Sequence, residues 1–199
     1  MSRDISQVTL RPGTTEDVPA VLRLVDIAIE WLVSHGRTSQ WGTEPRSKDP
    51  ARIKQATEFA ESGGMWLAVT KPDRGDQTKS ELGNEVTSGD IVVKDGEWVI
   101  GALTVGDAMS YVTPATEPEL YIKFLITDRS WAGSGLGTLL LDKARELARQ
   151  ANVTLLRVDC FAGQDQKLVK YYESQGFVRT ESFERDNWQG QILVQRLNE

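Results

Sequence analysis

The stretch that decides the fold runs from Glu119-Leu-Tyr-Ile-Lys-Phe-Leu-Ile-Thr127 into Ala132-Gly-Ser-Gly-Leu-Gly137. The first segment predicts a β-strand. Since alternate side chains of a strand share a face, we expect one apolar face made by Leu120, Ile122, Phe124 and Ile126. The second segment predicts the start of an amphipathic helix. Its apolar positions are Leu136, Leu139, Leu140, Ala144, Leu147, Ala148 and Ala151.

The three glycines of the second segment need a physical reason, because glycine costs backbone entropy on folding. Without Cβ atoms, successive backbone N–H groups can converge on an anion, and a helix N-terminus adds unpaired donors and a partial positive charge. A pyrophosphate is the ligand that this arrangement suits. A glycine turn that only packs a strand closely against a helix is the alternative.

The kind of phosphate ligand is narrowed by the surrounding sequence. No lysine follows the glycines, which excludes a P-loop. Gly133-x-Gly135-x-Gly137 is close to the dinucleotide-binding fingerprint, and Asp159 lies about 22 residues later, where a ribose-binding acid would sit. However, the last 40 residues hold one short helix and paired strands, which leaves no room for a doubly wound sheet. A nicotinamide-dependent oxidoreductase remains an alternative.

Working outward, the pattern predicts a mixed α/β (α+β) fold with helices packed on a central sheet. Residues 71–90 are polar and glycine-rich, and we expect a mobile surface insertion there. A turn is expected at Trp188-Gln-Gly190. Further strands are expected at 8–11, 65–70, 97–105, 153–161 and 191–197, and helices at 14–32, 51–62 and 164–175.

Composition limits the class of protein. The chain has 199 residues, one cysteine, one histidine and a net charge of −6. That size predicts a single domain, and the negative charge argues against a nucleic-acid surface. A lone histidine and a lone cysteine leave no ligands for a structural zinc site, so no metal is expected. No signal peptide or membrane span is recognisable, and we expect a cytoplasmic protein without a membrane partner.

A second motif lies downstream, Asp165-Gln-Lys-Leu-Val-Lys-Tyr-Tyr172-Glu-Ser-Gln-Gly-Phe177. Together with the glycine loop, it resembles the GNAT (GCN5-related) acetyltransferase family over residues 119–183, and Leu10-Arg-Pro12 resembles the family's opening. The resemblance implies a mostly antiparallel sheet with one splayed parallel strand pair, and one domain divided into an acceptor-side part (8–118), a cofactor core (119–183) and a last strand (184–199). It also implies a monomer or homodimer that uses acetyl-CoA.

By the same resemblance, backbone groups of the strand would pair with the pantetheine arm, and loop amides would hold the pyrophosphate. Two positions depart from the family: Ala132 stands where Arg or Gln is usual, and Asp165 replaces the common Asn. Arg129 is a possible substitute for the missing side chain. The expected cofactor-binding residues are Leu125, Ile126, Thr127, Ala132, Gly133, Ser134, Gly135, Leu136, Gly137, Thr138, Asp165 and Tyr172.

Acetyl transfer to an amine requires a neutral nucleophile, and alkylamines are mostly protonated at pH 7 (reference pKa about 10.4). Glu119 is the expected base, since its place ahead of the loop resembles that of the family's glutamate; a solvated carboxylate is the alternative, and Glu117 and Asp107 are further candidates. Tyr172 matches the family tyrosine that faces the leaving sulfur, and a packing role is its alternative. Cys160 has apolar neighbours, which indicates a buried thiol.

The acceptor site is expected from segments ahead of the cofactor core, where Trp31, Trp41 and Tyr111 lie with Glu119. Aromatic walls suit an amine through cation–π or stacking contacts, although core packing is equally open for Trp31. The sequence therefore predicts an acetyl-CoA-dependent N-acetyltransferase acting by direct attack on a primary amine of a small molecule, amino acid or protein. A GNAT-fold protein that binds acyl-CoA without catalysis is the second hypothesis.

Overall fold

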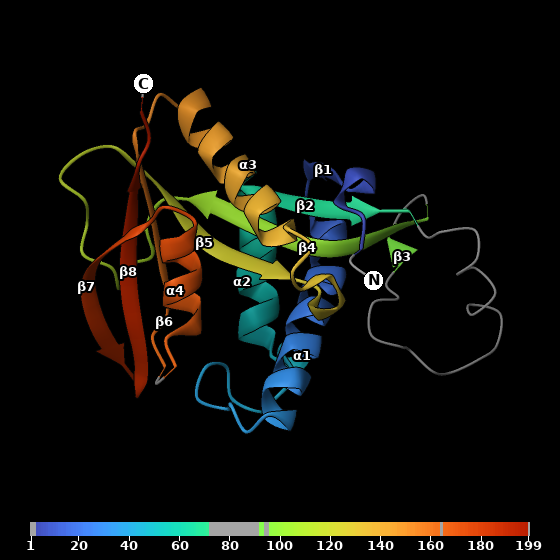
Figure 1. Ribbon diagram of the computed structural model, residues 1–199. Helices are drawn as coiled ribbons and strands as arrows, with labels where there is room; N and C mark the ends of the chain where they lie inside the picture. The colour runs from blue at the N-terminus through green and yellow to red at the C-terminus, as the bar shows by residue number, and fades with distance from the viewer. Residues whose placement is uncertain (1–2, 72–91, 94–95, 164, 199) are drawn as a thin grey trace, which may run out of the picture.

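The computed structural model describes residues 3–71, 92–93, 96–163 and 165–198 (Figure 1). Its strands form one mixed sheet in the order β1-β2-β4-β5-β6-β8-β7, with β3 paired to β4. The insertion expected at 71–90 falls almost entirely outside the described residues. The strands are β1 (Thr9–Pro12), β2 (Met65–Thr70), β3 (Val92–Val93), β4 (Glu97–Gly106), β5 (Glu119–Thr127), β6 (Leu155–Phe161), β7 (Val178–Arg185) and β8 (Trp188–Arg196).

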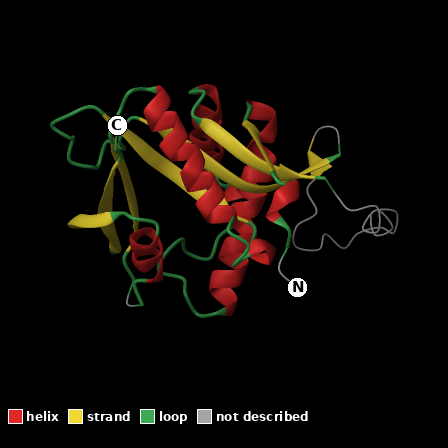
Figure 2. Cartoon of the chain, turned by 45° about the horizontal axis from the view of Figure 1, so that its top comes forward, coloured by secondary structure: helices red, strands yellow, loops and turns green. Residues whose placement is uncertain are grey.

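Four α-helices of the described chain cover the two faces of this sheet (Figure 2). They are α1 (Val18–Ser34), α2 (Pro50–Glu61), α3 (Leu136–Gln150) and α4 (Lys167–Ser174). One apolar cluster joins α3 and α4 to the sheet through Leu140, Val169 and Leu156. A second cluster joins α1 and α2 to the opposite face. The expected mixed α/β fold with flanking helices is confirmed.

The sheet opens between β5 and β6. These two strands are parallel and pair over four residues only, from Glu119↔Leu155 to Ile122↔Val158. Beyond the Ile122–Val158 pair, which we call the vertex, β5 continues to Thr127 beside β4 alone. In Figure 1 the two arms of the sheet diverge from this point. This is the splayed parallel pair that the family resemblance implied.

A bulge in β5 changes which face its side chains occupy. Thr104 pairs with Phe124 but Val105 pairs with Ile122, so Lys123 is an extra residue without a partner in β4. A one-residue shift moves every following side chain to the other face. The apolar residues before it, Leu120 and Ile122, pack with α3 and α4, and those after it, Phe124 and Ile126, pack with α1 and α2. The prediction that all four share one face is wrong for this reason.

The last hairpin turns earlier than predicted. Asp186 and Asn187 have φ values of 49° and 64°, and Arg185 pairs with Trp188. Two central residues with positive φ make a type I′ turn, whose twist suits a two-residue hairpin. The prediction of a turn at Trp188-Gln-Gly190 is therefore wrong. Gly190 lies within β8, where an added Cβ would come within 2.4 Å of the Phe183 ring.

Candidate active site

The glycine loop follows β5 and leads into α3. Gly133 and Gly135 have φ values of +79° and +90°, a region that L side chains rarely adopt, so glycine is required at both. Gly137 has a different reason, because a Cβ there would lie 2.3 Å from the Tyr171 hydroxyl oxygen. Two glycines thus shape the turn, and the third lets α4 approach the first turn of α3.

Several backbone donors converge at this helix start. The amides of Gly133, Gly135, Gly137 and Thr138 donate no hydrogen bond within the described part of the chain, whereas the Leu136 amide donates to the Ser134 hydroxyl at 3.3 Å. Unpaired amides and the partial positive charge of a helix N-terminus attract anions. The loop therefore has the donors that a pyrophosphate needs, and they belong to the backbone.

Of the two departures from the family pattern, Asp165 has partners in the structure, and Arg129 was the possible substitute for the side chain missing at Ala132. Asp165 forms an ion pair with Arg37 at 3.0 Å and accepts a hydrogen bond from the Lys167 amide at 3.2 Å, which lowers its pKa. Arg129 does not point freely toward the loop. Its guanidinium lies 3.8 Å from the ring centroid of Trp31, and burial, followed by the charge of Arg37, lowers its pKa.

The free edge of β5 supplies further backbone groups. The Asp128 amide donates to the Ile100 carbonyl at 2.7 Å. Because hydrogen bonding alternates along an antiparallel pair, Phe124 and Ile126 direct their backbone groups to β4. Leu125 and Thr127 direct theirs to the opposite edge, where β6 has diverged. Of the three residues expected to pair with a pantetheine arm, Leu125 and Thr127 thus have outward backbone groups, and Ile126 does not.

Tyr172 lies on the α3–α4 side of the vertex. Its ring packs edge-on against Phe177 at a centroid distance of 5.6 Å, and the residue is only 6% exposed. Burial raises the pKa of Tyr172 well above its ordinary value. Burial also raises the pKa of Cys160 to about 12, so this thiol stays neutral and packs in the core.

Glu119 lies at the closed end of the β5–β6 pair. Its two carboxylate oxygens accept hydrogen bonds from Nη1 of Arg157 at 3.1 and 2.9 Å, and both side chains are largely buried. Arg157 also donates to the Thr113 carbonyl at 3.0 Å. The carboxylate expected to act as base is therefore engaged in an internal ion pair. Glu117, a further candidate, is paired with Arg196.

A different carboxylate occupies the vertex. Asp159 is the first β6 residue after the pairing with β5 ends. It accepts a hydrogen bond from the Tyr121 hydroxyl at 2.6 Å and a longer one from Tyr111 at 3.3 Å. Burial raises its pKa. From its sequence position, Asp159 was expected only as a ribose ligand. The parallel register that brings it beside Tyr121 was the missing information, although its position late in a buried strand was a visible signal.

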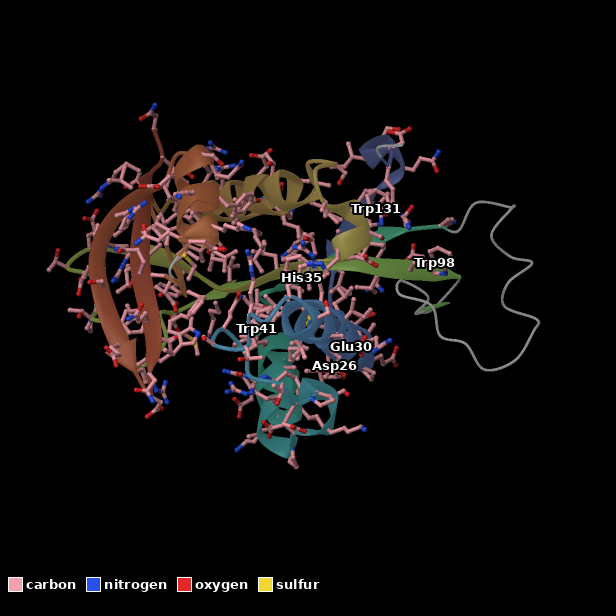
Figure 3. All side chains as sticks on the ribbon, turned by 60° about the horizontal axis from the view of Figure 1, so that its bottom comes forward. Asp26, Glu30, His35, Trp41, Trp98 and Trp131 are labelled. Atoms are coloured by element: carbon pink, nitrogen blue, oxygen red, sulfur yellow. The ribbon has the colours of Figure 1, made fainter. Side chains whose placement is uncertain are left out.

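The long loop between α1 and α2 borders the same region. Asp26 in α1 anchors it by accepting hydrogen bonds from the Arg46 amide at 2.6 Å and the Ser47 amide at 3.2 Å. Figure 3 shows Trp41 in this loop and His35 at the end of α1. Trp41 packs partly against the α1–α2 cluster. The indole N–H of Trp188 in β8 donates to the Gln40 carbonyl at 3.0 Å, which ties the loop to the second arm of the sheet.

The structure does not bring the expected acceptor residues together, since Glu119 is paired with Arg157 and Trp41 packs on the α1–α2 cluster. Tyr111 reaches the vertex through Asp159. Trp31 stacks on His35 at a centroid distance of 4.1 Å and contacts Arg129, which lies just ahead of the glycine loop. Among the described residues, no group of three or more His, Cys, Asp or Glu side chains is placed to hold a metal ion. No described helix has the length and apolar character needed to cross a bilayer.

Comparisons with known proteins agree with this geometry. The profile of the Acetyltransferase (GNAT) family matches residues 55–177. The chain superposes on a GNAT-family acetyltransferase from Listeria monocytogenes (17% identity, 96% and 95% of the two chains covered, TM-score 0.61) and on a putative phosphinothricin N-acetyltransferase (21%, 96% and 99%, 0.60). It also superposes on yncA, a putative acetyltransferase from Salmonella typhimurium with its cofactor acetyl-CoA (14%, 97% and 95%, 0.59). No curated protein sequence matches the chain significantly.

The profile covers more than half of the chain, and the fold agrees with it. The chain belongs to the GNAT acetyltransferase family, whose members use acetyl-CoA as acyl donor. This membership assigns acyl transfer as the class of reaction and removes the doubly wound nicotinamide fold from consideration.

Proposed function

We propose that this protein transfers the acetyl group of acetyl-CoA to a primary amine of a small molecule, amino acid or protein, by direct attack of the amine on the thioester. The supporting observation is a continuous path of open backbone groups, from the amides at the start of α3 along the free edge of β5 to the vertex. If the pyrophosphate of acetyl-CoA binds at the start of α3, an extended pantetheine arm along the free edge of β5 would bring the thioester to the vertex.

The proposed cofactor contacts come mainly from the backbone. The amides of Gly133, Gly135, Gly137 and Thr138 would hold the pyrophosphate, and the outward groups of Leu125 and Thr127 would pair with the arm as an added strand does. Bound acetyl-CoA supplies the activated acyl group. Since backbone donors do not depend on side-chain identity, Ala132 and Asp165 leave this cradle intact.

Tyr172 is proposed to face the leaving sulfur. Its raised pKa keeps the phenol protonated at every physiological pH. A thiolate with a reference pKa of about 8.5 is a weaker base than this phenolate. The phenol therefore stabilises the departing sulfur mainly by donating a hydrogen bond, and complete proton transfer has to accompany loss of a proton from the attacking nitrogen.

Two measurements test the proposed function. In calorimetry, we expect acetyl-CoA to bind and NAD(P) not to bind; binding of NAD(P) without binding of acetyl-CoA would contradict the proposal. In the second, release of CoA thiol from acetyl-CoA is followed across a panel of primary amines, amino acids and aminoglycosides. Thiol release that depends on an amine supports the transferase.

A non-catalytic acyl-CoA-binding protein is the second candidate, and the substitutions at positions 132 and 165 motivate it. Acetyl-CoA binding without thiol release in the presence of any amine of the panel would favour this candidate.

A further inference from the structure

Among the described residues around the vertex, one carboxylate has no cation to pair with. Asp159 is a half-buried carboxylate, and its hydrogen-bond partners are two neutral phenols, Tyr121 and Tyr111. No Lys, Arg or His of the described residues forms an ion pair with it. Arg157, the buried guanidinium on the same strand, is engaged by Glu119. Burying a carboxylate without a cation is costly. A bound cation would lower that cost.

The position of Asp159 also suits the reaction. The strand alternation sets Asp159 and Tyr121 on one face of the sheet, while Cys160 and Tyr172 belong to the cluster on the α3–α4 face. The vertex, where the proposed pantetheine arm ends, therefore has a carboxylate on one side and a phenol on the other. Glu119 lies two residues farther into the paired end of β5 than Tyr121, which is about 7 Å along the strand.

The surroundings of Asp159 indicate the kind of cation. Tyr111 and Phe183 have ring centroids 5.7 Å apart, Phe183 and Trp188 lie 5.8 Å apart, and Trp188 is 5.8 Å from Phe161. Tyr111 is 38% exposed, the other three rings are partly exposed, and Phe161 shares the face of Asp159. Aromatic rings attract organic cations and cover apolar groups, and they discriminate against strongly hydrated ions.

We propose, building on the transferase function above, that Asp159 is the catalytic carboxylate that binds the ammonium group of the acceptor and takes its proton, and that the acceptor is a primary amine with an apolar or aromatic body. Tyr121 holds the carboxylate in place, and the rings from Tyr111 to Phe161 contact the body of the amine.

The ammonium gives one proton to Asp159, and the neutral nitrogen attacks the thioester carbonyl. The new C–N bond forms, and the C–S bond breaks as Tyr172 donates its hydrogen bond to the leaving sulfur. The second proton lost by the nitrogen ends on the thiol, and Asp159 returns its proton to solvent. The products are the amide, free CoA and one proton.

The test uses acetyl-CoA with 2-phenylethylamine and the variant Asp159→Asn, which keeps the size and the hydrogen bond from Tyr121. We expect kcat/KM for the amine to fall by about 10² to 10³-fold, with the Kd of acetyl-CoA within about two-fold of wild type. Asp142→Asn is the matched control, since Asp142 is an exposed residue of α3 paired with Arg145. It should leave thiol release unchanged. An Asp159→Asn variant with wild-type kcat/KM would overturn the proposal, and so would a wild type that acetylates amino acids or aminoglycosides but not 2-phenylethylamine.

A stability measurement separates this role from a structural one. The folded-state pKa of Asp159 is raised, so its ionised form opposes folding above that pKa, and this penalty is absent below the ordinary pKa near ~4. Asp159→Asn should raise Tm at pH 8, with the gain disappearing near pH 4. The titratable groups on its own face are Tyr121 and Tyr111, and Cys160 and Tyr172 act on it from the α3–α4 face. The nearby cations are Arg157 and Arg185, whose guanidinium groups lie 5.8 Å and 5.1 Å from the ring centroids of Tyr121 and Tyr111. A variant with lower Tm at pH 8 would assign Asp159 to structure and overturn the proposal.

A failure of the proposed transferase function can be distinguished from a failure of the proposed role of Asp159. If wild type releases no thiol with any amine, 2-phenylethylamine is titrated into the protein–CoA complex at pH 8. Binding to wild type that Asp159→Asn abolishes supports the cation site even then. Equal binding in both proteins, or binding in neither, overturns it.

Discussion

The two ends of the proposed cofactor path differ in how they are made. At the phosphate end the donors are backbone amides, and the side chains nearby, such as Arg129 and Asp165, are engaged elsewhere. At the vertex the proposed chemistry rests on individual side chains, Tyr172 on one face and Asp159 on the other. A backbone site tolerates sequence change, whereas a side-chain site does not. We therefore expect substitutions at the vertex to have larger effects than substitutions at the loop.

The largest effect is expected at the closed end of the β5–β6 pair, from Glu119→Gln. This change leaves Arg157 buried without a carboxylate, and breaking a buried ion pair costs about 3 to 5 kcal/mol. The free energy of unfolding, measured by urea titration, should fall by that amount. Glu119→Gln with Arg157→Met should recover much of the loss, because it also removes the uncompensated charge.

The same variant decides which carboxylate is the base. At a temperature where Glu119→Gln is fully folded, we expect its kcat to fall less than ten-fold. A loss of 100-fold or more, with the pH–rate profile altered, would return the base role to Glu119.

The next effect is expected at Tyr172. Tyr172→Phe removes the hydrogen bond to the departing sulfur and should lower kcat by about 10 to 100-fold. The Kd of acetyl-CoA, measured by calorimetry, should stay unchanged, because the ring and its packing on Phe177 remain. Since the pKa of Tyr172 is raised, the wild-type rate should show no alkaline decline from this group below about pH 10. Unchanged turnover with chemistry rate-limiting would exclude the role.

A smaller effect, in the favourable direction, is expected at the phosphate end. Ala132→Arg restores the side chain usual in the family and adds one charge-assisted contact to a pyrophosphate. At an exposed position such as Ala132 this is worth about 1 kcal/mol, or about five-fold in Kd. The gain should shrink in high salt, and Ala132→Gln serves as the uncharged control. An unchanged Kd would show that an added side-chain contact contributes nothing beyond the backbone amides.

The smallest effect is expected for the ion pair between Arg37 and Asp165. Both side chains are well exposed, and exposed pairs contribute less than about 1 kcal/mol. Arg37→Ala should therefore change the unfolding free energy by no more than this, and a double-mutant cycle with Asp165→Asn isolates the pair. A coupling energy above 2 kcal/mol would show that this contact holds the α1–α2 loop closed.

The parts of the molecule that depend on local pattern were predictable. β2 and β5 were predicted with the bounds that the structure gives them, and the glycine loop was located before its φ values were known. Long-range pairing was not predictable. Tyr121 and Asp159 are 38 residues apart in sequence, and their contact depends on the parallel register of β5 and β6. The pairing of Glu119 with Arg157 depends on the same register, which is why the two carboxylates could not be told apart from sequence.

The bulge at Lys123 reverses which alternate residues of β5 lie on each face of the sheet. Before it, odd-numbered residues such as Tyr121 lie on the face of Asp159; after it, even-numbered residues such as Phe124 pack with α1 and α2. The inward-facing positions of β5 are therefore even-numbered on one side of Lys123 and odd-numbered on the other, for a given face of the sheet. Deleting or inserting a single residue here would move the side chains of half of the strand to the opposite face of the sheet. It would also turn the backbone groups of that half from the free edge toward β4, and the reverse. The length of this segment is thus as strictly constrained as its composition.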